Sequence, residues 1–251
     1  VSAMVLGSQA VNLYLPAAIR DEFAKVGLAH ALAASGFQVS LILAIVGSLT
    51  GRLSARAKFA YGVAALLIFL GLTGPQAPVL RAVIMGMAAL TAMVQERKIK
   101  PFGSLLLAAT ILLLINPLWI QDLSFQLSFL ATLGLLTTVP ALMKRLDWLP
   151  PVLAGAIALP IAASIWTLPL QLYVFNVVSP YSILVNVIST PLITIISIGG
   201  FISALAGLIW PLAGSAIAWP LYYPAHWLIQ LVEFFGQLPG NSVAVGAIAL
   251  W

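Results

Sequence analysis

The chain contains 251 residues, of which 62% are hydrophobic and only 7% are charged, and its mean hydropathy is +1.12. Soluble globular proteins carry about 25% charged residues, so the composition excludes that class and predicts a membrane protein with several spans. The chain has no cysteine, which excludes disulfides, thiolate metal sites and cysteine nucleophiles. Basic loops alone can produce the net charge of +5, so this charge does not by itself indicate nucleic-acid binding.

Residues 1–28 predict a short amphipathic helix at the membrane interface. Beyond Pro16, apolar Ile19 and Phe23 stand among the charged positions 20, 21, 22 and 25. The chain begins at Val1, without an initiator methionine or a cleavable signal pattern, so we expect it to be an excerpt from a longer protein.

The rest of the chain predicts an all-α, polytopic membrane bundle of about eight spans, because each apolar stretch is long enough to cross most of a hydrocarbon layer about 30 Å thick. The stretches are approximately 29–50, 59–74, 78–94, 102–115, 123–139, 151–175, 181–209 and 217–235. Pro191 falls in the middle of 181–209, which is too long for one simple span. We therefore predict a broken or re-entrant helix there, with a half-helix at 181–189 and a full span to 209.

Charge in the short loops predicts the topology. Loops 51–58, 96–101 and 141–150 are basic, whereas the loops between them carry no charge or only Asp122. Because lysine and arginine favour the cytoplasmic side, we place these three loops in the cytoplasm and both chain ends outside it. The predicted organisation is an amphipathic segment at 1–28, a transmembrane domain at 29–236 and a connection to a downstream segment at 237–251.

The stretch 29–50 is unusual for an anchoring helix because its first half is polar. It contains His30, Ser35, Gly36 and Gln38, and small residues recur every three or four positions from Gly36 to Gly51. Polar groups in lipid need partners, and small residues let helices approach closely. The functional interpretation is a polar channel lining or a break in the backbone near the outer end of this helix. The alternative is that these groups form hydrogen bonds between helices that hold the bundle together.

Arg81 is the formal charge that lies clearly inside a predicted span, three residues after Pro78. Charged residues inside spans are costly and often functional. The alternative is that its long side chain reaches the outer headgroups, which requires no function.

Hydroxyl and amide side chains form three further polar faces. Ser124, Ser128 and Thr132 are spaced by four, with Gln126 elsewhere on the same helix. We expect Asp122 either to cap this helix or to lie at a pore mouth. The second face contains Ser164, Thr167 and Gln171. The third and longest lies around Pro191 and contains Ser182, Asn186, Ser189, Thr190, Thr194 and Ser197. Irregular backbone is tolerated where it lines a cavity, so the face around Pro191 is the best candidate lining, although helix contacts explain such stripes equally well.

Enzymatic chemistry is not predicted. The two histidines, His30 and His226, are far apart, and no H-x-H-x-D or H-E-x-x-H pattern occurs. We expect no catalytic residue, metal or cofactor in this chain.

Four blocks of the sequence resemble, in order, those of the ComEC-type competence family. The first, H-A-L-A-A-S-G-F-Q-V, resembles H-L-L-A-x-S-G-L-H-V, with Gln38 in place of the second histidine. The second and third are A-P-V-L-R-A, which contains Arg81, and L-S-F-Q-L-S-F-L-A-T-L-G at 123–134. The fourth, at 167–193, is similar to L-P-L-x-x-Y-H-F-x-x-x-S-x-x-S-x-x-A-N, with Val174 in place of a histidine. Neither Gln38 nor Val174 can titrate, so no proton-relay role is expected at these positions.

The resemblance implies a multi-pass inner-membrane channel that passes single-stranded DNA into the cytoplasm during natural transformation. The sequence has no nucleotide-binding loop, so a cytoplasmic motor or single-strand-binding protein is expected to drive uptake, and homo-oligomers are a further expectation. Relatives carry a metallo-β-lactamase-like domain, so any nuclease activity is expected outside these residues. An arginine at an outer vestibule could pair with DNA phosphate.

The candidate lining or gating residues are His30, Ser35, Gly36, Gln38, Arg81, Ser124, Gln126, Ser128, Gln171, Asn186 and Thr190. The alternatives to a DNA channel are a small-solute or ion transporter, which broken helices would also suit, and a non-conducting scaffold subunit.

Overall fold

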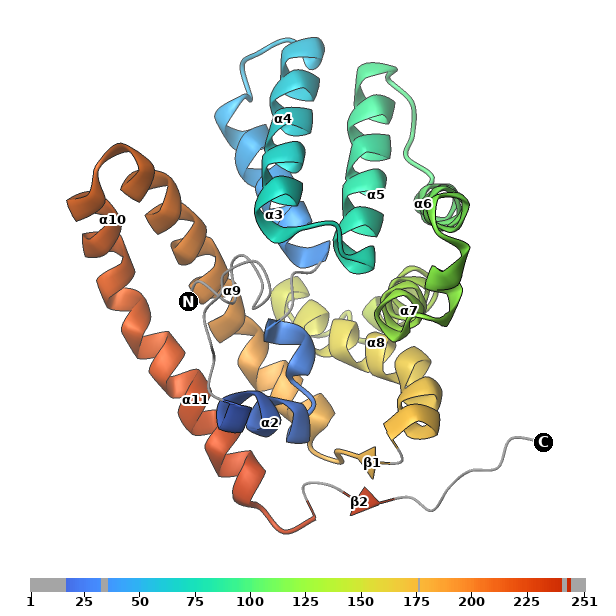
Figure 1. The fold of residues 1–251 in the computed structure, drawn as a ribbon, viewed down its shortest axis with the longest axis vertical. Helices are drawn as coiled ribbons and strands as arrows, with labels where there is room; N and C mark the ends of the chain where they lie inside the picture. Colours follow the sequence, from blue (N-terminus) through green and yellow to red (C-terminus); the bar gives the residue numbers. More distant parts are fainter. Residues whose placement is uncertain (1–16, 33–35, 176, 241–242, 245–251) are drawn as a thin grey trace. The chain divides into compact units, whose positions relative to one another are not determined.

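The computed structural model describes residues 17–32, 36–175, 177–240 and 243–244, and it divides into two compact units (Figure 1). Unit 1 comprises Val1–Ala33 and Thr137–Trp251, and unit 2 comprises Ala34–Leu136. Helices form nearly all of the described structure. The predicted all-α class is therefore confirmed.

Unit 2 contains α3 (Gly36–Leu49), α4 (Ala55–Thr73), α5 (Ala77–Val94), α6 (Pro101–Ile115), the 3₁₀ helix η2 (Pro117–Gln121) and the first part of α7 (Leu123–Arg145). Unit 1 contains α2 (Ala17–Lys25), the 3₁₀ helix η1 (Ala29–Leu32), the end of α7, α8 (Pro151–Phe175), α9 (Ser182–Ile209), α10 (Pro211–Ala218), the 3₁₀ helix η3 (Trp219–Leu221) and α11 (Tyr222–Gln237). The strands β1 (Val177–Val178) and β2 (Val243–Ala244) pair antiparallel.

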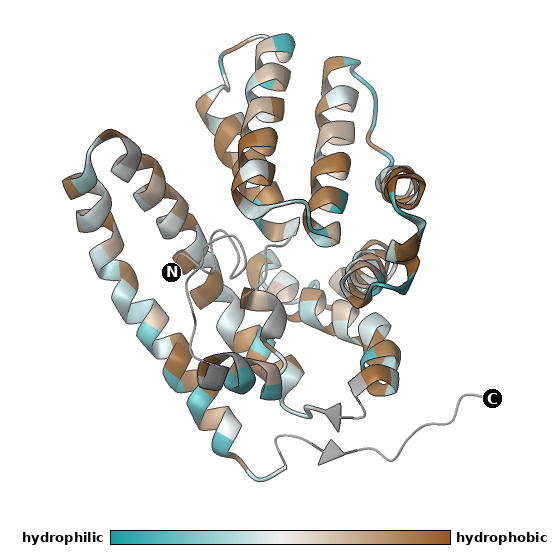
Figure 2. Cartoon of the chain, in the orientation of Figure 1, coloured by the Kyte–Doolittle hydropathy of each residue, from teal (hydrophilic) through white to brown (hydrophobic). Residues whose placement is uncertain are grey.

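Five of the described helices are long and apolar enough to cross a membrane, namely α4, α5, α7, α8 and α9. Two shorter apolar helices, α3 and α6, have 14 and 15 residues. Figure 2 shows hydrophobic residues over most of these helices. The structure thus supports a membrane-spanning bundle. The predicted count of eight spans stays a prediction.

The first predicted span, 29–50, is not one helix. Its start forms η1, and α3 begins only at Gly36. Leu28 and Leu32 are buried in the core of unit 1, whereas Val39 and Ile42 are buried in unit 2. The stretch is divided because its two halves pack into different cores, which local hydropathy does not reveal.

The predicted break at Pro191 is also wrong, because α9 runs without interruption through 28 residues. Proline removes one backbone donor and normally kinks or ends a helix. Hydroxyl groups add bonds to nearby carbonyls: Thr190 Oγ1 donates to Asn186 O at 2.5 Å, and Thr194 Oγ1 donates to Thr190 O at 2.8 Å. Val185 and Ile196 are buried in one core on either side of the proline, which holds both halves in line.

That core of unit 1 joins α2 to α9 and α11. Phe23 and Val26 pack with Leu228 and Val232, while Asp21 and Lys25 at the other face of α2 are exposed. The short amphipathic helix predicted within 1–28 therefore exists at 17–25. Its apolar face covers the α9–α11 pair.

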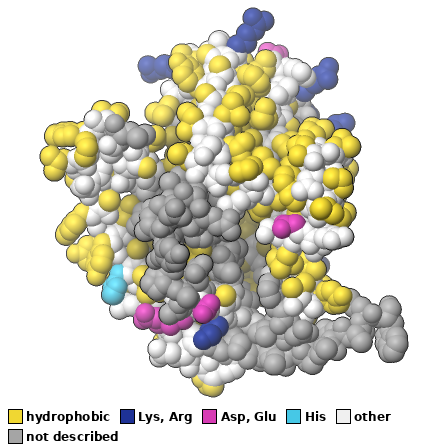
Figure 3. All heavy atoms as spheres, viewed as in Figure 1, with side chains coloured by type: hydrophobic (Ala, Val, Ile, Leu, Met, Phe, Trp, Pro, Cys, Tyr) yellow, Lys and Arg dark blue, Asp and Glu magenta, His cyan; other side chains and the backbone are white. Residues whose placement is uncertain are grey.

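The basic loops of unit 2 lie at one end of the α4–α5 hairpin. This hairpin starts after loop 50–54 and ends before loop 95–100, so the Lys and Arg side chains of both loops gather at the same end (Figure 3). The turn at the opposite end contains Gly74, whose φ of 81° lies in the region that glycine favours. In Figure 1 α6 is seen nearly end-on while α4 and α5 lie in the plane, so these helices do not form a parallel bundle.

Helices α9 and α10 form a tight hairpin. A Cβ added at Gly214 would lie 2.6 Å from Gly207 Cα, and Ser203 Oγ donates to Gly214 O at 2.9 Å. The helices therefore touch backbone to backbone, which only glycine permits.

We predict that Gly214→Ala lowers the melting temperature of the detergent-solubilised protein, because the added methyl group must push α9 and α10 apart at a cost of about 1–3 kcal/mol. Thermal unfolding measures the effect. The matched control is Gly155→Ala within α8, where a Cβ meets nothing within 4 Å. The control should be neutral or stabilise by up to about 1 kcal/mol. Equal melting temperatures for the two variants would contradict the close packing.

Candidate functional site around Arg81

Three helices of unit 2 meet at the Arg81 side chain, which is only 8% exposed. Arg81 lies near the start of α5, and its Nη1 donates to the carbonyl oxygen of Ser128 on α7. Its Cζ lies 5.9 Å from the centroid of the Phe129 ring, within the range of a cation–π contact. The alternative that Arg81 extends to the headgroups is therefore wrong, because the guanidinium turns inward.

Gly36, the first residue of α3, makes room for this guanidinium. A Cβ built at Gly36 would lie 3.0 Å from Arg81 Nη2 and 3.6 Å from Ala82 Cβ. The absence of a side chain thus allows the start of α3 to lie directly against the arginine.

The position of Ser128 is set by the start of α7. Asp122 Oδ1 accepts a hydrogen bond from the Phe125 backbone N–H at 2.7 Å, which confirms the predicted capping role. Phe125 is buried with Ala77 and Leu112, and the rings of Phe125 and Phe129 lie 4.3 Å apart. The cap and this aromatic pair fix the helical turn that carries Ser128 towards α5.

The charge of Arg81 has no carboxylate partner among the described residues. Its Nε and the Ser128 hydroxyl are both buried and have no hydrogen-bond partner in the described part of the chain. A buried cation normally requires pairing, because removing a charge from water costs several kcal/mol. Among the residues that the structure describes, the guanidinium contacts a carbonyl and an aromatic ring.

The other candidate residues of unit 2 have different surroundings. Gln38 on α3 is buried, at 3% exposure. Gln126 Nε2 donates to Ile120 O at 2.8 Å, and Ser124 is exposed. The predicted stripe on α7 is therefore divided: Ser124 lies on the surface, whereas Ser128 lies at the guanidinium.

The candidates of unit 1 bond within their own helices. Gln171 Nε2 donates to Thr167 Oγ1 at 3.3 Å on α8. On α9, Asn186 Nδ2 donates to Ser182 O at 2.8 Å, and Thr190 bonds to Asn186 as described above. Ser35 and the side chain of His30 lie outside the described residues. A lining role for all these residues stays a prediction.

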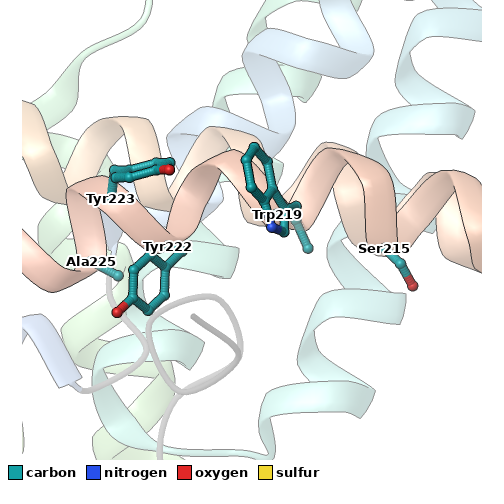
Figure 4. Close-up of a pocket in the computed structure, with 6 residues that line it drawn as sticks. Ser215, Trp219, Tyr222, Tyr223 and Ala225 are labelled. Atoms are coloured by element: carbon teal, nitrogen blue, oxygen red, sulfur yellow. The ribbon is translucent and has the colours of Figure 1, made fainter.

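A second feature, absent from the predicted site list, is an open hollow on unit 1 lined by aromatic rings (Figure 4). Trp219, Tyr222 and Tyr223 surround it with Ser215, Ala218 and Ala225. The His226 ring stacks on Tyr222, with centroids 5.6 Å apart. The density of Trp and Tyr between 219 and 227 is already visible in the sequence and predicts an interfacial position. Exposed Trp and Tyr side chains are typical of membrane interfaces.

Metal ligands do not gather in the described part of the chain: no three His, Asp or Glu side chains lie close enough to hold an ion. The site around Arg81 consists instead of hydrogen-bond donors and a positive charge.

The model of the family described as "Competence protein" matches residues 4–251. The chain belongs to this competence family. ComE operon protein 3 of Bacillus subtilis (strain 168) is 26% identical over 254 residues, covering all of this chain and 31% of the relative. An uncharacterized protein of Aquifex aeolicus (strain VF5) is 29% identical over 203 residues, covering 81% of the chain and 46% of that protein. The chain thus spans less than half the length of either relative. No solved structure matches it.

Family membership confirms the resemblance and, with the apolar helices, identifies a membrane protein. Three of the four blocks that resemble competence-family signatures contribute to one place, through Gly36, Arg81 and Ser128. This meeting point is the best candidate functional site of the competence-family chain.

We predict that Gly36→Ala lowers the melting temperature, because the new methyl group must shift the buried guanidinium by a few tenths of an ångström from its place beside the Ser128 carbonyl. The same change in an Arg81→Gln background should cost much less, giving a coupling of roughly 0.5–3 kcal/mol in a double-mutant cycle. Thermal unfolding of the four proteins measures this coupling.

Gly47→Ala is the control on the same helix, since a Cβ there meets nothing within 4 Å. It should be neutral or slightly stabilising in both backgrounds. Additive effects of Gly36→Ala and Arg81→Gln would show that the two residues do not contact each other.

Proposed function

We propose that this chain is part of the path by which single-stranded DNA crosses the inner membrane during natural transformation. The observation that carries the proposal is the match of the competence family to residues 4–251, nearly the whole chain. The matched protein from Bacillus subtilis, ComE operon protein 3, supports the same role.

Transport by this chain requires an external energy source, because its sequence contains no nucleotide-binding loop. A cytoplasmic motor or single-strand-binding protein would pull the strand inward, and the basic loops 51–58, 96–101 and 141–150 would meet it at the cytoplasmic exit. Copies of the chain are proposed to associate as homo-oligomers. Any nuclease activity would belong to a domain outside these residues.

The proposed path is lined by amide, hydroxyl and guanidinium groups. The residues proposed for this lining are His30, Ser35, Gly36, Gln38, Arg81, Ser124, Gln126, Ser128, Gln171, Asn186 and Thr190. The amides of Gln126 and Asn186 each bond to a carbonyl a few residues away. Such a bond satisfies the amide in an empty path and can be exchanged for a bond to water or to the strand.

These same local bonds favour one rival, a non-conducting scaffold subunit. If the polar groups of α8 and α9 serve only their own helices, replacing them with apolar residues of similar size should leave DNA uptake intact. The experiment below therefore separates the two candidate functions.

We predict that Gln126→Leu and Asn186→Leu, introduced into the gene that encodes this chain, each reduce transformation by about tenfold or more, because removing one hydrogen bond to a charged ligand costs about 1.5–3 kcal/mol. Transformants per amount of linear marker DNA are counted, and membrane levels of each variant are measured by immunoblot. DNA bound at the cell surface should be unchanged while DNA protected from external nuclease falls.

The control is Thr110→Val on α6, whose hydroxyl is exposed and bonded to Leu106 O. This variant should transform normally. Normal transformation by both leucine variants at wild-type membrane levels would overturn the lining role and favour the scaffold. Flux of small solutes into liposomes containing the purified protein would favour a solute transporter instead.

A further inference from the structure

The positively charged guanidinium of Arg81 lies against the start of helix α3, which is itself positively polarised. The first turn of an α-helix carries partial positive charge, equivalent to about half an elementary charge, because its backbone N–H groups point away from the helix without intrahelical partners. The first residue of α3, Gly36, lies against the Arg81 guanidinium. The guanidinium and the first turn of α3 therefore repel each other unless an anion lies between or beside them.

Two buried donors without partners lie on the residues that meet here. Arg81 Nε and Ser128 Oγ are buried without a partner among the described residues, although the carbonyl of the same serine accepts a bond from Arg81 Nη1. A buried polar group without a hydrogen bond costs about 1–3 kcal/mol. Arg81 and Ser128 contact each other and each has one such group, so their presence requires an explanation. A ligand that accepts hydrogen bonds from both would remove this cost.

We propose that Arg81, the Ser128 hydroxyl and the first turn of α3 bind an oxyanion of the phosphate class. The ligand must be an anion because the site offers a cation and a helix N-terminus, and no carboxylate of the described residues neutralises them. It must accept several hydrogen bonds at once, since the site offers N–H and O–H groups. Phosphate oxygens match a guanidinium and a hydroxyl in this way.

The source of the phosphate rests on the function proposed above: we assign it to the backbone of the DNA strand. A backbone phosphate is present in every nucleotide, so a site of this kind holds a strand without reading its sequence. A phospholipid headgroup offers the same chemistry, and the experiment separates the two sources.

The test measures the melting temperature of the purified chain in a neutral maltoside detergent and phosphate-free buffer. Sodium phosphate is compared with sodium chloride at equal ionic strength. A short oligothymidylate is compared with a peptide nucleic acid of the same length, which carries bases without phosphates. Phosphatidylglycerol is compared with diacylglycerol. A ligand that binds the folded protein raises its melting temperature in a concentration-dependent way.

We expect phosphate and oligothymidylate to raise the melting temperature and the peptide nucleic acid to have no effect. Arg81→Gln should abolish the rise. Ser128→Ala should weaken binding by roughly tenfold, the effect of losing one hydrogen bond to a charged group. Without ligand, Ser128→Ala should melt no lower than the wild type, because its hydroxyl has no partner to lose. The control is Thr110→Val on α6, whose exposed hydroxyl bonds to Leu106 O and which should respond like the wild type.

The proposal is overturned if no phosphate compound raises the melting temperature, or if Ser128→Ala responds like Thr110→Val. This comparison remains decisive if Arg81→Gln fails to fold. A rise with inorganic phosphate or phosphatidylglycerol, but none with oligothymidylate, would confirm the oxyanion site and overturn DNA as its source. Normal transformation by a Ser128→Ala strain whose purified protein has lost the response would likewise overturn DNA as the ligand, while leaving the proposed DNA uptake in place.

Discussion

The structure depends on one constraint: polar groups among apolar helices must find partners within the protein, because lipid offers none. Unit 1 meets it locally, since the hydroxyl and amide groups of α9 bond to carbonyls of the preceding turn. Unit 2 meets it only in part at Arg81, where a carbonyl and an aromatic ring replace the counter-ion that a buried guanidinium normally has. This difference makes Arg81 the candidate functional residue.

Three residues around Arg81 accommodate its guanidinium. Gly36 supplies space, Phe129 supplies a ring face, and the Ser128 carbonyl supplies an acceptor. The aspartate cap and the Phe125–Phe129 pair hold that carbonyl in place at the start of α7. A side chain kept only to fill space would not need this arrangement. The blocks that resemble the competence family and the contacts of the guanidinium therefore involve the same residues.

Expectations failed where the result depended on packing between distant segments. Residues 29–50 have the hydropathy of a span, yet their ends belong to different cores, so the helix starts only at Gly36. Pro191 has the local properties of a helix break, yet buried Val185 and Ile196 on either side keep α9 continuous. Arg81, three residues from Pro78, was compatible with both a headgroup position and a buried one. In each case the local pattern allowed two outcomes, and packing selected one.

The sequence by itself determined the membrane class, the approximate positions of most helices, the cap at Asp122 and the competence family. These depend on composition, on short-range spacing and on motifs, all of which are local properties of the chain. It also singled out Gly36, Arg81 and Ser128 separately. Only the tertiary structure decided that they meet, because Ser128 is 47 residues from Arg81 and contacts of that range depend on how whole helices pack.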